Sequence, residues 1–230
     1  MRTTGTVVNR QSDKRLLQGE VTRTALLAAA RQLFGENGFA ATSTEEIVAA
    51  AGVTKGALYH HFGGKQELFA VVLEQVLHEV SDAVVAIFNQ PDPWLDLVDG
   101  CAAWIDAHRD TAVRRIVLTD ARAVLDEEAV RAVESRYAVV ALRGALRKNM
   151  TAGTLDPEPL RPLALMLIGA LREACLYVAD ADDQATARDE AVALVTRMLS
   201  SFRSTGASTP MLDADGSGPA VRSRSQRLEG

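Results

Sequence analysis

The stretch STEEIVAAAGVTKGALYHHF, residues 43–62, predicts two short helices joined by a tight turn. Ser43 and Glu46 have the spacing of a capping box, which begins the first of these helices. Gly52 ends this helix, because a helix end often needs a left-handed backbone that glycine adopts at no cost. A second helix is expected from Thr54 to about His61. Two short helices around a glycine turn form a helix–turn–helix.

The two helices have different inner and outer residues. Ile47, Val48, Val53 and Leu58 are spaced to form a small core between them. The outer positions of the second helix are small, cationic or tipped with a hydrogen-bond donor: Thr54, Lys55, Gly56, Tyr59, His60 and His61. Such residues suit a phosphate-lined DNA groove. An ordinary helix pair of any helical protein fits the same spacing, so the pattern alone leaves DNA binding and plain packing both open.

Helical periodicity continues on both sides of this stretch. Upstream, an apolar stripe from Leu26 to Phe34 stops at Gly35 and Gly38. Downstream, a long amphipathic helix is predicted to begin at Lys65 and to end before Pro91. Further helices are expected at about 94–108, 111–124, 127–150, 158–180 and 185–202. No alternating stretch typical of strands is present, so the fold is predicted to be all-α: a three-helix head followed by a helical body.

Composition excludes several classes of protein. The chain has 230 residues, of which 47% are hydrophobic, and a net charge of −5. Neither a wholly disordered chain nor a polycation that coats nucleic acid has this balance. Residues 1–65 nevertheless carry 8 Lys and Arg against 5 Asp and Glu, whereas residues 66–202 carry 13 against 22. A basic head on an acidic body favours an anionic partner for the head.

The sequence also bears on the cellular compartment. Cys101 and Cys175 belong to no cysteine cluster, which favours buried thiols in a reducing cytosol. The first residues lack the apolar segment of a secretory signal. The longest uncharged apolar run, Pro162–Leu171, is about half of what a membrane-spanning helix needs. We therefore expect a cytoplasmic protein without a membrane partner.

Four regions are predicted along the chain. Residues 1–20 are expected to be a flexible arm, residues 21–65 the helix–turn–helix domain, residues 66–202 a helical body, and residues 203–230 a disordered tail. The arm contains Arg10, Lys14 and Arg15, and it fits either a simple disordered terminus or a segment that reaches a minor groove.

A family resemblance rests on GVTKGALYHHF at 52–62 and KQEL at 65–68. The flanking segments agree with it: AAARQLF at 28–34, Gly38-Phe39 and Thr42-Ser43-Thr44. Over residues 22–70 or so, the chain resembles the DNA-binding head of the TetR (tetracycline-repressor-like) family of transcriptional regulators. The rest resembles the family only as a helical body of the expected length.

The resemblance implies DNA contacts by position. Thr54, Lys55, Gly56 and Ala57 fall where family members meet base edges and nearby phosphates. Residues matching phosphate-holding positions are Tyr59, His61, Lys65 and, at a helix N-terminus, Ser43 and Thr44. His60 is added as part of the same surface, although a solvated or packing role fits it as well. Glu45 departs from the pattern by adding a negative charge there, and we expect it to cap the helix and face away from DNA.

The body is predicted to hold a homodimer and a ligand pocket. The last two helices are apolar on more than one face, which favours a four-helix bundle between two chains through Leu167, Leu171, Leu194 and Met198. The resemblance also implies that residues 66–202 bind an unidentified, largely apolar small-molecule effector, and the aromatic and polar residues suited to it are Phe88, Trp94, Trp104, His108, Met166, Glu173 and Tyr177. Plain core packing fits each of these seven residues as well.

No catalytic motif is recognisable, and no cofactor or metal is expected. Gly63-Gly64-Lys65 lacks the remaining residues of a phosphate loop, and His60 and His61 point about 100° apart on a helix with no third ligand nearby. The expected function is therefore that of a ligand-responsive regulator, with a repressor favoured, that binds a palindromic double-stranded DNA operator as a homodimer. The alternative is a helical interaction adaptor that does not bind DNA.

Overall fold

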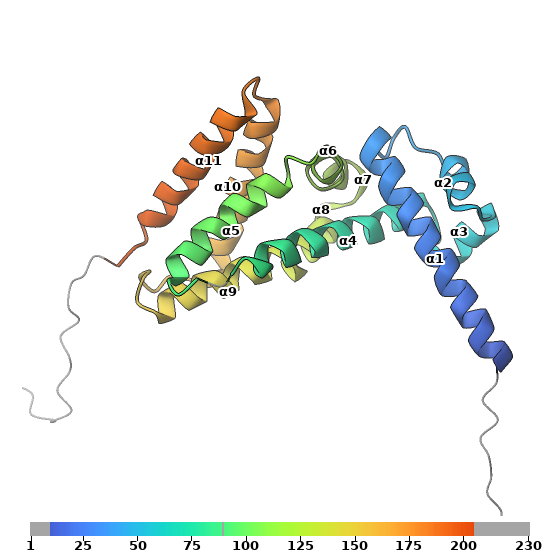
Figure 1. Cartoon of the computed structure of the whole chain (residues 1–230), viewed down its shortest axis with the longest axis horizontal. Helices are drawn as coiled ribbons and strands as arrows, with labels where there is room; N and C mark the ends of the chain where they lie inside the picture. The colour runs from blue at the N-terminus through green and yellow to red at the C-terminus, as the bar shows by residue number, and fades with distance from the viewer. Residues whose placement is uncertain (1–9, 89, 205–230) are drawn as a thin grey trace, which may run out of the picture.

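The computed structural model describes residues 10–88 and 90–204, and within these ranges it is helical, with only an isolated β-bridge between Leu155 and Arg203. The predicted all-α fold is confirmed. Figure 1 shows the head at one end of the molecule, the body at the other, and a long helix that joins them. The head consists of α1 (Arg10–Asn37), α2 (Thr44–Ala51) and α3 (Lys55–Phe62), and the joining helix is α4 (Lys65–Ala86).

The first helix is longer than its apolar stripe indicated. We expected residues 1–20 to form a flexible arm, but α1 begins at Arg10, so residues 10–20 are helical. Residues 1–9 lie outside the described part of the chain. The stripe marks only the part of α1 that packs on the head, where Leu26, Ala30 and Phe34 are fully buried. Periodicity detects a buried face, and no side chain from residue 17 to residue 25 is buried.

The helix–turn–helix forms through local contacts that the sequence predicted. The Ser43 side chain accepts a hydrogen bond from the Glu46 N–H, and the Glu46 carboxylate accepts one from the Ser43 N–H, which completes the capping box. Gly52 has a left-handed backbone, with φ of 65°. Its N–H donates to the Ala49 carbonyl and that of Val53 donates to the Val48 carbonyl, as in a Schellman motif.

The core of the head depends on α4 as well as on α1–α3. The Phe34 ring lies 5.4 Å from the Phe69 ring of α4 and 5.6 Å from the Phe39 ring, centre to centre. At its other end α4 packs in the body, where Val84 is buried. The boundary expected between residues 65 and 66 therefore falls inside a continuous helix, and a movement of α4 in the body would be felt in the head.

The body has more breaks than the sequence indicated. It consists of α5 (Pro93–Ala107), α6 (Thr111–Arg114), η1 (Arg115–Asp120), α7 (Ala121–Val124), α8 (Glu127–Arg136), α9 (Ala138–Thr151), α10 (Leu160–Asp180) and α11 (Gln184–Ser200). The segment 111–124, expected as one helix, has a π-helical centre in η1. The helix expected over 127–150 breaks at Tyr137, whose hydroxyl donates to Glu74 of α4 at 2.9 Å. That tertiary contact leaves no trace in the periodicity.

The C-terminal end of the described chain is also packed. The Arg203 guanidinium lies over the Trp94 ring, 4.7 Å from its centre. The Ser204 N–H donates to the Thr154 carbonyl at 3.1 Å. The tail that we expected from residue 203 thus begins no earlier than residue 205, and residues 205–230 lie outside the described chain.

Helix α10 is unusually apolar. It has 21 residues, and an 18-residue stretch of it has a mean hydropathy of 1.6, so it is the one helix in the described ranges that is long and apolar enough to cross a membrane. The ten-residue run from which we excluded such a segment is thus only part of a longer apolar helix. One side of α10 packs in the body through Leu163, Leu167 and Leu171, so its composition follows at least partly from its place in the core.

Candidate nucleic-acid interface and ligand cavity

Helix α3 presents a polar face to solvent at the end of the head. Leu58 and Phe62 point inward and are buried, whereas Lys55, Gly56 and His60 are exposed. Tyr59 is 48% exposed, so its ring is not part of the buried core. His61 is half-buried beside the Phe62 ring. The exposed face combines a cation, a phenol and an imidazole around a glycine.

Nothing inside the head requires glycine at position 56. A Cβ placed there would approach no atom more closely than the Thr54 hydroxyl, at 3.9 Å, and the backbone is helical. Glycine in a helix costs about 0.5–1 kcal/mol relative to alanine. The fold therefore gains nothing from Gly56, and a reason for glycine has to be sought outside the chain, in the close approach of a partner.

Lys55, an expected base or phosphate contact, is paired within the head. Its Nζ lies 2.5 Å from the Glu45 carboxylate of α2, and both side chains are exposed. Hydrogen bonds donated by Lys55 and Thr44 lower the pKa of Glu45 to about 2, and the bond that Lys55 donates to Glu45 raises the pKa of Lys55. Ser43 and Glu46 form the capping box of α2, so Glu45 does not have the capping role that we expected. Instead it holds the lysine that faces the proposed partner.

Three hydroxyls of the predicted interface already have partners. Ser43 and Thr44 donate to Glu46 and Glu45, at 2.8 and 2.9 Å. Thr54 caps α3 by accepting from the Ala57 N–H at 3.3 Å. These groups build the two helix starts, and a phosphate would have to share them or to use the backbone N–H groups.

Lys65 has a structural role that the sequence did not indicate. Its Nζ donates to the carbonyls of Phe39 and Thr42, at 2.9 and 2.8 Å, and lies 4.1 Å from the centre of the Phe39 ring. These two carbonyls lie in the turn between α1 and α2. An ammonium has three donors, so one remains for a phosphate. Lys65 thus ties α4 to the turn that orients α2.

A small apolar cavity lies in the body, among residues of α4, α5, α9 and α10. Phe88, Cys101, Trp104, Leu142 and Leu171 are among the residues that line it, and its volume is about 30 Å³. This is roughly the space of one or two water molecules. Burial raises the pKa of the Cys101 thiol to about 12. Both cysteines are buried and free, as expected.

Only some residues expected to contact a ligand lie at this cavity. Phe88 and Trp104 line it. His108 is buried against Trp104, with its Nδ1–H donating to the Trp104 carbonyl at 2.8 Å, and burial lowers the pKa of its imidazole. Trp94 is buried beneath Arg203. The other three are exposed on the solvent-facing side of α10: Met166, Glu173 and Tyr177.

The residues expected at a dimer interface divide in the same way. Leu167 and Leu171 are each 3% exposed and belong to the core of the protomer. Leu194 and Met198, on α11, are about half-exposed. Met166 and Tyr177 are exposed on the solvent-facing side of α10. The Tyr177 hydroxyl donates to Glu190 of α11 at 2.6 Å. We refer to Met166, Tyr177, Leu194 and Met198 as the outer face.

A helix–turn–helix with an exposed polar second helix, on a separate helical body, is the architecture of a DNA-binding regulator. Comparison with known proteins gives the family. Residues 26–72 match the family described as "Bacterial regulatory proteins, tetR family", and residues 94–202 match "Tetracyclin repressor-like, C-terminal domain". The chain belongs to the TetR family of transcriptional regulators.

Individual relatives agree with this assignment. The chain is 30% identical to the HTH-type transcriptional regulator ArpR of Pseudomonas putida over 157 residues, which are 61% of this chain and 73% of ArpR. It is 32% identical to UidR of Escherichia coli over 87 residues, which are 38% of this chain but only 42% of UidR. A TetR-family regulator from Pectobacterium atrosepticum has a similar structure, with a TM-score of 0.69 and 32% identity over 81% of this chain and 96% of that one.

Proposed function

We propose that this regulator binds a palindromic DNA operator as a homodimer, represses transcription there, and is released by a small, largely apolar effector. The observation that carries the DNA contact is the exposed face of α3, where Lys55, Gly56, Tyr59 and His60 lie together. Tyr59 supplies a donor for a phosphate, and Lys55 a cation for a base edge or a phosphate. Gly56 lets the helix approach a groove closely.

The outer face supports a homodimer. Met166 is 72% exposed and Leu194 is 55% exposed, and contiguous apolar surface on two adjacent helices is typical of an interface. Two such helix pairs related by a two-fold axis form a four-helix bundle. A two-fold dimer would bring the α3 helices to successive major grooves, about 34–36 Å apart or a multiple of that. A palindromic operator follows from this symmetry.

The apolar cavity is the proposed effector site. Ligand pockets typically have volumes of about 300–1,000 Å³, whereas this cavity has about 30 Å³. An effector must therefore move the surrounding helices apart when it binds. Helix α4 lines the cavity through Ser81 and Val84, so it would move with them. This movement is the proposed signal for release.

Two connections would carry the movement to the head. The first is α4 itself, since Phe69 belongs to the head core and Lys65 holds the turn between α1 and α2. The second is η1, from which Asp120 accepts a hydrogen bond from the Phe39 N–H at 2.8 Å. In addition, Arg115 donates to the Gly35 carbonyl at the end of α1, at 2.8 Å. π-Helical turns are frequent at functional sites.

A selection from a library of random-sequence duplexes, followed by titration of the selected duplex at several salt concentrations, tests this function. We expect a palindromic motif and an affinity that falls steeply with salt, because phosphate contacts release counterions. Phenylalanine at position 59 should weaken binding to all sequences alike. No enrichment above the starting library, with folded protein, would favour the alternative of a helical adaptor that does not bind DNA. A cytoplasmic location is part of the proposal, since the operator lies in that compartment.

A further inference from the structure

A second and much larger hollow lies between α7, α8, α9 and α10. Its volume is about 840 Å³, within the range of ligand-binding pockets. Five arginines line it, and we refer to it as the arginine cleft: Arg122, Arg131, Arg143, Arg161 and Arg172. Leu165, Ile168 and Gly169 of α10 form an apolar part of its wall.

The charge of the arginine cleft is opposite to that of the body around it. Residues 66–202 hold 13 Lys and Arg and 22 Asp and Glu. The cleft is lined by five of these cations and by only two of these acids, Glu127 and Glu134. In the body as a whole acidic residues outnumber basic ones, whereas in the arginine cleft basic residues outnumber acidic ones. A concave site lined by one sign of charge concentrates ligands of the opposite sign.

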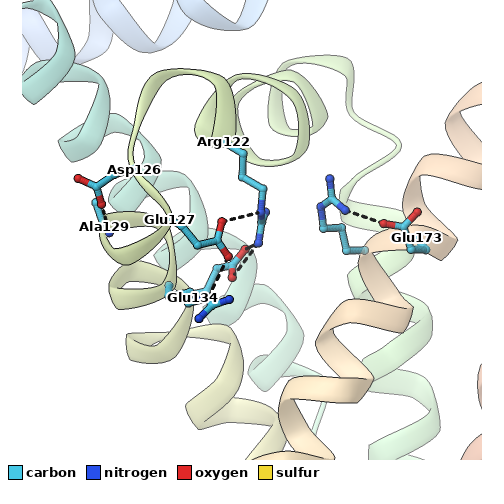
Figure 2. Close-up of polar contacts among 8 residues, drawn as sticks. Arg122, Asp126, Glu127, Ala129, Glu134 and Glu173 are labelled. Atoms are coloured by element: carbon cyan, nitrogen blue, oxygen red, sulfur yellow. Dashed lines mark hydrogen bonds and ion pairs between the residues drawn. The ribbon is translucent and has the colours of Figure 1, made fainter.

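The two glutamates do not satisfy the five arginines. Figure 2 shows Arg122 reaching Glu127 and Glu134, with Glu173 on the neighbouring helix α10. Arg122 donates to Glu134 at 2.9 Å, and Arg131 donates to Glu127 at 2.9 Å. No carboxylate within the described ranges pairs with Arg143 or Arg161.

Three of the five arginines also have a buried N–H group without an acceptor, whether or not the arginine forms an ion pair. Nη1 of Arg122, Nε of Arg143 and Nε of Arg172 are buried, and none of them has a hydrogen-bond partner within the described chain. A buried donor without an acceptor is costly. A guanidinium binds a carboxylate or a phosphate through two parallel N–H groups, so an anion in the cleft would supply the missing acceptors.

The arginine cleft and the apolar cavity share a wall. Ile168 lines both of them, and its neighbour in the helix, Leu171, lines the cavity. A ligand that enters past Ile168 would have its apolar part among Phe88, Trp104 and Leu142, and its polar end among the arginines. The two hollows together match a molecule with an apolar body and an anionic group.

We propose that the arginine cleft binds the anionic group, a carboxylate or a phosphate, of an amphipathic ligand whose apolar part enters the cavity. The proposal rests on the effector function proposed above and changes the expected chemistry of the effector from a largely apolar molecule to an organic anion. Arg143 is the central residue, because it comes from α9, which also lines the cavity, and has no acid as a partner in the described chain. Arg122 is the second residue after η1, so an anion bound to it lies close to the segment that contacts the head.

Three probes with ten carbon atoms each test the proposal on the full-length protein without DNA: decanoate and decyl phosphate below their micellar concentrations, and decanol below its solubility limit. Binding is followed by calorimetry and by tryptophan fluorescence, because Trp104 lines the cavity. We expect at least one of the two anions to bind about 10-fold more tightly than decanol, as hydrogen bonds to charged groups usually provide. Whether decanoate or decyl phosphate binds better identifies the anionic group.

Two arginine variants separate a specific contact from general charge. Arg143→Gln should remove most of the preference for the anion and leave the affinity for decanol within about twofold. Arg147→Gln, an exposed position on the same helix that does not line the cleft, should leave the preference unchanged. Equal binding of the three probes to the wild type, or a preference that persists in Arg143→Gln, would overturn the proposal.

A third result would also overturn it. If Arg143→Gln weakened self-association and left the preference for the anion unchanged, the cleft would be filled by acids of a second copy of the chain. Light scattering on the same samples detects this. Since no DNA is present, any of these failures leaves the proposed DNA-binding function untouched, and that function is tested by the duplex selection.

Discussion

Replacement of Gly56 by alanine tests whether the fold or a partner requires glycine at this position. The added methyl group meets nothing closer than 3.9 Å and removes the entropic cost of glycine in a helix. We expect the free energy of unfolding to rise by about 0.5–1 kcal/mol. The affinity for the operator should nevertheless fall by about 10-fold or more, because the methyl group would keep α3 away from the groove.

Gly144→Ala is the matched control for this variant. Gly144 lies in the middle of α9, is exposed, and a Cβ there meets nothing within 4 Å. The Gly144→Ala variant should be stabilised against thermal unfolding to an extent similar to Gly56→Ala, and it should bind the operator as the wild type does. If Gly56→Ala were stabilised and also kept full operator affinity, close approach of α3 to DNA would be refuted.

His108 makes the stability of the body depend on pH. Burial lowers the pKa of its imidazole in the folded protein below the ordinary value of 6.5. The unfolded chain therefore binds more protons in the pH range between the folded and unfolded pKa values, and the stability contributed by neutral His108 is lost as the pH falls below 6.5. Thermal unfolding at pH 7.5 and 5.5 should show a lower Tm at the acid pH.

The variant His108→Asn isolates this residue. The Asn side-chain N–H can replace the donor to the Trp104 carbonyl, but it does not titrate. We expect the Tm of this variant to fall less than that of the wild type over the same pH range, with the difference confined to values below about 6.5. An identical fall in both proteins would assign the pH dependence to other groups.

At the residue scale, local contacts were predictable and distant ones were not. Ser43 and Glu46 are three residues apart, and Gly52 determines the conformation of its own backbone, so both can be read from the sequence. Lys65 donates to a carbonyl 26 positions earlier in the chain, and the Glu45–Lys55 pair spans the turn. A residue's type does not indicate which distant partner it contacts, so these roles required the structure.

At the scale of elements, the outer face predicts how the protein assembles. Glutamate at position 194 would place a charge in the proposed interface, where it would be desolvated without a partner. We expect Leu194→Glu to weaken the dimer by about 100-fold and to retain its helicity. Light scattering after size-exclusion chromatography, at micromolar concentration, distinguishes monomer from dimer.

Val140→Glu provides the comparison for this variant. Val140 is 56% exposed on α9 and lies outside the outer face, so the Val140→Glu variant should remain dimeric. The account of assembly would fail if the wild type were monomeric under these conditions, or if both variants dissociated equally.

Helix α10 shows what periodicity leaves open about an element. Its apolar composition favours a second packing surface besides the core, and this surface stays a prediction. Which side faces which partner depends on tertiary packing. Leu167 and Leu171 turn toward the body and Met166 toward solvent, so burial within the protomer disfavours a dimer contact for the first two, and Met166 joins the proposed dimer surface instead. Likewise, the helix breaks at Tyr137, whose hydroxyl donates to Glu74 of α4, and the spacing of apolar residues does not mark this position.

At the scale of the whole molecule, the joint between η1 and the head is expected to couple the effector to DNA. Linked sites usually change each other's affinity by about 5–150-fold. Asp120→Ala removes the acceptor for the Phe39 N–H, whereas Asp120→Asn keeps one. We expect the alanine variant to bind decanol normally but to lose most of the effect of operator DNA on that binding, and the asparagine variant to retain it. Equal coupling in the wild type and the alanine variant would exclude this route.

The central claim is that α3 reads DNA sequence. The most direct test is a selection of DNA duplexes by protein variants in which Lys55 or its partner Glu45 is changed. The wild type, Lys55→Gln and Glu45→Gln would each be incubated with the same random-sequence duplex library, and the bound molecules sequenced. We predict the same half-site spacing for all three proteins, because the dimer sets it. The Lys55→Gln motif should change at one symmetric pair of positions, whereas Glu45→Gln, which frees Lys55 without altering it, should retain the wild-type motif. Identical motifs for the wild type and Lys55→Gln, or no motif for the folded wild type, would contradict the claim.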